Sequence, residues 1–115
     1  MKHPVTLTLD SPLTMRMLAY ASQLMKSLGL NHDVNSDPIL ANEVGRLVRL
    51  TSAFLQIIKV DIKPHLVVRA CVYHCLLHYM PSKTREFLGK YRFDRRTTLF
   101  LSKVLELRII ANGET

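Results

Sequence analysis

Residues 64–80 read PHLVVRACVYHCLLHYM, and this stretch decides the fold. Pro64 suits a first helical position, because no intrahelical hydrogen-bond donor is lost there. Apolar side chains follow nearly all round the predicted helix, so that no face of it is plainly solvated. A helix of this kind is usually the one around which others pack. We therefore predict a central helix over residues 64–80, with Asp61 as its cap and Pro81 as its end.

Two amphipathic helices are predicted on the N-terminal side of this stretch. Each begins with a capping residue followed by proline, Ser11-Pro12 in the first helix and Asp37-Pro38 in the second. Apolar residues then recur at helical spacing, and Gly29 supplies a C-terminal stop for the first helix. The two predicted helices cover residues 12–28 and 38–59.

Two shorter helices are predicted in the last third of the chain. Ser82 is placed to cap a helix that reaches about Tyr91, and Asp94 is placed to cap one that runs toward Ile110. Residues 105–109 also alternate between apolar and charged side chains, which is the pattern of a strand. Helix is preferred for this tail, and a strand is the alternative.

The N-terminus carries the second strand-like pattern. Val5, Leu7 and Leu9 alternate with threonines, which suits one short strand, and the alternative C-terminal strand would pair with it. No internal repeat or long linker interrupts the chain. The sequence therefore predicts an all-α fold, a compact bundle of four to five helices with one short N-terminal strand, in a single domain over residues 1–115.

Composition limits the environment and the partners. The net charge of +7 and the isoelectric point near 9.8 favour polyanionic partners. Hydrophobic residues make up 48% of the chain, which is high for so small an interior, so we expect some apolar surface to meet a partner. The first helix carries Met15, Met17 and Met25 in addition to its leucines. They either fill the core or join a protein partner, with a homodimer as the default.

The same composition predicts an intracellular protein, cytoplasmic or nuclear, with no membrane partner. No apolar run approaches the roughly 18 residues of a membrane-spanning helix, and the N-terminus lacks the apolar core of a signal peptide. Cys71 and Cys75 lie four residues apart in an apolar stretch, where a helix seldom gives them disulfide geometry. A reducing compartment is the simpler interpretation.

Positive charge is concentrated between residues 83 and 103, where seven Lys or Arg stand against Glu86 and Asp94. Phe87, Tyr91 and Phe93 are interleaved with these cations, and bases can stack on aromatic rings while phosphates attract the charges. The order of short helix, tight turn and helix also has helix-turn-helix proportions. The residues predicted to contact nucleic acid are Lys83, Arg85, Lys90, Arg92, Arg95, Arg96, Thr97 and Lys103.

The alternative for this basic segment is a solvated charged face with its three aromatic rings in the core. A salt-dependent affinity for random duplex DNA would distinguish the two interpretations.

A second cluster of chemically active side chains lies on the predicted central helix. Cys71, His74, Cys75 and His78 fall at i, i+3, i+4 and i+7, which is one face. These are zinc ligand types, but a rise of about 1.5 Å per residue prevents all four from pointing at one tetrahedral centre. We therefore predict no metal site and no cofactor, and we expect both thiols to be buried as small apolar groups.

The expected function is binding and not catalysis. The chain has no Gly-rich phosphate loop and no nucleophile elbow, and its nine scattered carboxylates form no acid–base pair that the sequence reveals. The favoured role is a nucleic-acid-associated regulator, with DNA as the preferred target. The alternative is a protein–protein interaction adaptor that uses no nucleic acid, because an acidic protein would also suit the basic segment.

Overall fold

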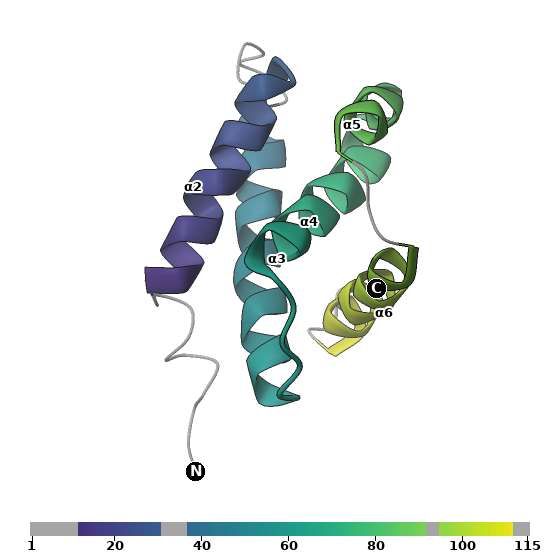
Figure 1. Ribbon diagram of the computed structural model, residues 1–115. Coiled ribbons are helices and arrows are strands. Elements are labelled where there is room, and N and C mark those ends of the chain that lie inside the picture. Colours follow the sequence, from purple (N-terminus) through teal and green to yellow (C-terminus); the bar gives the residue numbers. More distant parts are fainter. Residues whose placement is uncertain (1–11, 31–36, 92–94, 112–115) are drawn as a thin grey trace.

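The computed structural model describes residues 12–30, 37–91 and 95–111, and within these ranges the protein is a helical bundle (Figure 1). The predicted strand over residues 5–9 and the cap residues Ser11 and Asp94 lie outside the described residues. The described part holds no strand, which confirms the all-α bundle of four to five helices. Its elements are α2 (Pro12–Ser27), α3 (Asp37–Ile57), α4 (Pro64–Tyr79), the 3-10 turn η2 (Pro81–Lys83), α5 (Thr84–Lys90) and α6 (Arg95–Ala111).

Helix α4 is the centre of the bundle, as its sequence predicts. It contacts α2 and α3 on one side, and η2, α5 and α6 on the other. Val68, Cys71, Val72 and Leu76 of this helix have no exposed surface. Because several elements share α4 as their packing surface, side chains point into protein on most of its circumference.

Helices α2 and α3 run antiparallel beside each other, and α4 packs against both (Figure 1). Gly29 ends α2 as predicted, because its φ of 75° lies in the left-handed region that favours glycine. Helix α3 ends two residues earlier than predicted. Lys59 adopts the left-handed conformation there, at φ 59°, and the Val60 N–H donates to the Leu55 carbonyl at 3.0 Å.

Two predicted side-chain caps are wrong. Lys63 is the N-cap residue of α4 in place of Asp61, and it makes no side-chain capping bond. Its extended backbone is the conformation that a following proline imposes, so that Pro64 itself sets the start of the helix. Ser82 lies inside η2, and the Thr84 hydroxyl instead donates to the Pro81 carbonyl at 2.7 Å.

The C-terminal tail is helical, and the alternative of a strand over residues 105–109 is wrong. Helix α6 buries Leu101, Val104 and Leu105 at helical spacing, and it packs on α3 and α4 with this face. Three apolar residues on one helical face outweigh the alternation of charged and apolar residues that suggested a strand.

Candidate nucleic-acid interface

The predicted basic segment is divided between two regions of the surface. Helix α5 lies at the upper end of α4 in Figure 1, and α6 lies below it, beside α3 and α4. Lys83, Arg85 and Lys90 therefore belong to a different part of the molecule from Arg96 and Lys103. Arg92 lies outside the described residues, as do the side chains of Arg95 and Thr97.

The end of α5 is bound to the end of α2. The Lys90 ammonium donates to the Ser27 carbonyl at 2.8 Å, which satisfies one of the last carbonyls of α2. The Ser27 hydroxyl lies 3.0 Å from the Tyr91 hydroxyl and donates its single proton to the Leu24 carbonyl at 2.7 Å. Tyr91 is therefore the donor in the bond between the two hydroxyls.

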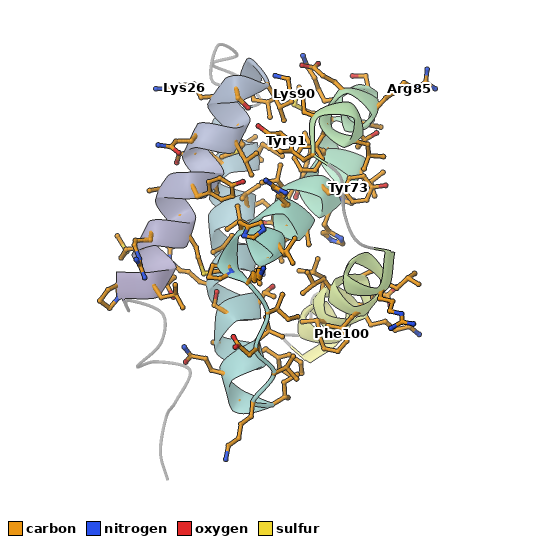
Figure 2. All side chains as sticks on the ribbon, viewed as in Figure 1. Lys26, Tyr73, Arg85, Lys90, Tyr91 and Phe100 are labelled. Carbon is orange, nitrogen blue, oxygen red and sulfur yellow. The ribbon has the colours of Figure 1, made fainter. Side chains whose placement is uncertain are left out.

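The hydrogen bonds of Lys90 and Tyr91 to Ser27 place a further cation, Lys26, near the cations of α5. Lys26 is in the last turn of α2, and Figure 2 shows it at the same upper end of the molecule as Lys90 and Arg85, with Lys26 on one side of Lys90 and Arg85 on the other. All three side chains are exposed. We call Lys26, Arg85 and Lys90 the basic end. Lys26 was missed in the sequence because it stands 59 residues before Arg85, and it is the hydrogen bonds of Lys90 and Tyr91 to Ser27 that relate the two.

Phe87 of α5 lies in the core, and Tyr91, directly after α5, packs against it. Phe87 has no exposed surface, and its ring centroid lies 6.2 Å from that of Tyr73 and 5.1 Å from that of Tyr91. The Arg69 guanidinium lies over the Tyr91 ring at 5.1 Å, while its Nε donates to the Tyr20 hydroxyl at 3.2 Å. Phe87 and Tyr91 are thus occupied by protein contacts, and Phe93 lies outside the described residues.

The charges near the basic end are unequally paired. Lys83 lies 3.7 Å from Glu86, one turn along the chain, so that its charge is partly compensated. Lys26 and Arg85 have no ion-pair partner among the residues that the structure describes. Among the described residues, Lys26, Arg85 and Lys90 therefore stand at this end against one carboxylate of α5, Glu86, which is itself paired with Lys83.

Helix α6 exposes a mixed stripe on the side opposite its buried face. Arg96, Leu99, Phe100 and Lys103 recur at helical spacing, and all four are exposed. We call these four residues the α6 stripe. Helix α5, residues 91–94 and α6 follow one another as a helix-turn-helix would, but α6 packs on α3 and α4, and α5 packs on α4 and η2. The two helices therefore do not form a packed helix-turn-helix pair.

The cysteines of α4 are buried, as predicted. Burial raises the pKa of the Cys71 thiol to about 12, opposed by its hydrogen bond to the Thr51 hydroxyl. Burial also raises the pKa of Cys75, and the neighbouring Cys71 adds to the effect. Both thiols are thus protonated at neutral pH and shielded from reagents.

The two histidines of the same face lie in different surroundings. His74 is half-buried, and its pKa is lowered mainly by burial and secondly by the neighbouring His78. His78 is exposed and packs edge-on against the Tyr79 ring at 4.7 Å. No group of three or more His, Cys, Asp or Glu side chains in the described part of the chain is arranged to hold a metal ion.

The carboxylate nearest this face belongs to α3. Glu43 accepts a hydrogen bond from Arg46 Nε at 3.2 Å, and this bond is the main cause that lowers the pKa of Glu43. The charges of Glu43 and Arg46 therefore compensate each other within α3.

The methionines of α2 divide between core and surface. Met17 and Met25 are buried, whereas Met15 is 53% exposed. A groove of about 340 Å³ lies between α2 and the start of α4, with Arg16 and His65 among the residues that line it. The described helices include none that is long and apolar enough to cross a membrane.

Comparisons with protein-family models, with characterised protein sequences and with solved structures find no match to this chain. Function is therefore inferred from the chemistry of its surface alone.

Proposed function

We propose that the protein acts by binding and not by catalysis, and that its basic end contacts the phosphate backbone of a nucleic acid, with duplex DNA as the preferred target. The observation that carries this proposal is the bond from the Lys90 ammonium to the Ser27 carbonyl, because it holds α5 against the end of α2. Cations from two distant segments thereby lie at one end of the bundle, Lys26 on one side of Lys90 and Arg85 on the other (Figure 2). Phosphate contacts of this kind supply affinity without reading sequence.

The positions of Phe87 and Tyr91 favour contact with the phosphate backbone of the nucleic acid over stacking on its bases. Phe87 has no exposed surface and Tyr91 is held by Arg69 and Ser27, so these rings are not free to stack. The Lys26 and Arg85 side chains, by contrast, are exposed, and the Lys90 ammonium is bound to the Ser27 carbonyl. The buried thiols of α4 likewise suit a binding protein better than an enzyme that uses a cysteine nucleophile.

The experiment is a titration of a fluorescent, random-sequence DNA duplex at several salt concentrations. Each phosphate contact contributes about −0.9 to the slope of log K against log salt. The double variant Lys26→Ala/Arg85→Ala should therefore bind about tenfold or more weakly at low salt, and its slope should be less steep by about 2. Both side chains are exposed, so the variant is expected to fold.

A charge-matched control separates this site from the effect of net charge. Arg16→Ala/Lys63→Ala removes two exposed cations from the start of α2 and the N-cap of α4, and it should leave the slope unchanged. A third variant, Arg96→Ala/Lys103→Ala, tests the α6 cations in the same titration. Equal losses in the first two variants would show that binding follows net charge, and the basic end would then not be the site.

A further inference from the structure

The α6 stripe combines exposed apolar groups with cations in a regular order. Arg96, Leu99, Phe100 and Lys103 stand at i, i+3, i+4 and i+7, so one helical face presents a cation, two apolar side chains and a second cation. The opposite face of α6 is buried on α3 and α4. The stripe therefore lies on the part of the circumference of α6 that is not buried on α3 and α4.

The apolar centre of the stripe is unusually open to water. Leu99 is 61% exposed, the highest value among the large apolar side chains of the described residues, and Phe100 is 39% exposed. An exposed Leu beside an exposed Phe is the kind of group that a partner covers at the centre of an interface. Cations at both ends would form the polar rim of such an interface.

A second copy of this chain fits the stripe poorly. An antiparallel pair of α6 helices that sets Leu99 against Phe100 also sets Arg96 against Lys103, and like charges meet at both ends. A register that sets Arg96 against Glu106 removes this repulsion. It places Leu99 against Lys103, however, and leaves the apolar pair uncovered.

A polyanion also fits the stripe poorly. Phosphates or lipid headgroups could meet Arg96 and Lys103, but Glu106 is exposed one turn beyond Lys103 and would face the same unbroken row of anions, whereas a protein helix can place a carboxylate at Lys103 and a neutral or basic residue at Glu106. The order of charges is mixed, with two cations followed by an anion. A surface of mixed charge around an apolar centre is complementary to another protein helix and not to a uniformly charged polymer.

We propose that the α6 stripe docks an amphipathic helix of a protein partner, with apolar side chains that cover Leu99 and Phe100 and with carboxylates that meet Arg96 and Lys103. This site is separate from the basic end and does not depend on nucleic-acid binding. We expect the partner helix to bind through apolar side chains at regular helical spacing, which pack against Leu99 and Phe100. Its acidic flanks provide orientation and selectivity.

The experiment uses a synthetic alanine-based peptide of about 18 residues, long enough to be partly helical in water. It presents two leucines on one face, with a glutamate one turn before and one turn after them. A second peptide replaces the glutamates with lysines, and a third replaces the leucines with serines. Binding is followed by the backbone amide NMR signals of the full chain, which also locate the contact.

The glutamate peptide is expected to shift the signals of residues 96–103. Leu99→Ser/Phe100→Ser should weaken its binding about tenfold or more, as truncation of central apolar anchors does. Met15→Ser, at an exposed apolar residue of α2, is the matched control and should leave binding unchanged. The lysine and serine peptides should each bind at least about tenfold more weakly than the glutamate peptide.

Several results would overturn the proposal. One is the absence of any shift at millimolar glutamate peptide, and another is equal binding of the lysine peptide. Sedimentation that shows a dimer abolished by Leu99→Ser/Phe100→Ser would assign the stripe to a second copy. If the same variant lost its binding to duplex DNA or to anionic phosphatidylglycerol vesicles, the stripe would be assigned to a polyanion.

Discussion

Removal of the Tyr91 side chain tests the contact that joins α5 to α2. The ring packs on Phe87 with a centroid distance of 5.1 Å, and the Arg69 guanidinium lies over it at 5.1 Å. The Tyr91 hydroxyl donates to Ser27 at 3.0 Å. In Tyr91→Ala all three interactions disappear together, while the backbone N–H of residue 91 still reaches the Phe87 carbonyl at 2.8 Å.

The expected loss of unfolding free energy follows from these three interactions. An aromatic pair contributes about 0.5–1.5 kcal/mol beyond area burial, a cation–π contact about 0.5–1 kcal/mol, and a hydrogen bond about 0.5–1.5 kcal/mol. The half-buried ring also loses apolar burial. Tyr91→Ala is therefore expected to cost about 3 kcal/mol, whereas Tyr91→Phe keeps the ring and should cost about 1 kcal/mol.

The measurement is urea unfolding followed by circular dichroism at 222 nm. Tyr79→Ala is the control, because Tyr79 is 45% exposed and makes its ring contact with the exposed His78. It should cost about 0.5 kcal/mol or less. A double-mutant cycle of Tyr91→Phe with Ser27→Ala should give a coupling of about 0.5–1 kcal/mol. Equal losses in Tyr91→Ala and Tyr79→Ala would refute the contact.

The remaining predictions concern the thiols, two glycines and one histidine. Cys71 and Cys75 should react with Ellman's reagent only after unfolding. Stability should also fall as pH rises from about 9 toward 12, because the unfolded thiols ionise first and the buried ones stay protonated; Cys71→Ala should reduce this fall. Gly89→Ala should stabilise the protein by about 0.5–1 kcal/mol in urea unfolding, since its new methyl group meets no atom within 4 Å. Gly29→Ala should destabilise it by about 1 kcal/mol, because Gly29 has a φ of 75°. The opposite signs would contradict the assigned backbone. The lowered pKa of His74 should make stability fall as pH drops below about 6.5, because the unfolded imidazole binds its proton first; an NMR titration midpoint at or above the ordinary value would refute this.

The helices could be predicted from the sequence because their signals are local. Proline at a first helical position, a left-handed glycine and apolar spacing each act within a few residues, and α2, α3 and α4 follow from them. The all-round apolar character of α4 even predicts its central position. The two missed caps show the limit of this reasoning, since Asp61 and Ser82 have suitable side chains in places where the adjacent proline sets the helix start.

The surface could not be predicted in the same way, because it depends on contacts between distant segments. Lys26 joins Arg85 only through the bonds of Lys90 and Tyr91 to Ser27, across more than 60 residues of chain. The interleaved aromatic residues were open to two interpretations, and the burial of Phe87 decides for the core. Local pattern gives the composition of a charged segment but not the direction in which its parts point.

The division of the basic segment has a physical origin in what each helix must bury. Helix α5 is seven residues long, and its one aromatic side chain, Phe87, packs against Tyr73 of α4, while its cations remain at the end of the bundle. Helix α6 buries Leu101, Val104 and Leu105. Because these residues face the bundle, Leu99 is exposed between Arg96 and Lys103. The basic end therefore carries cations beside the buried Phe87, and the α6 stripe carries cations around an apolar centre. We propose phosphate as the partner of the first surface and a protein helix as the partner of the second.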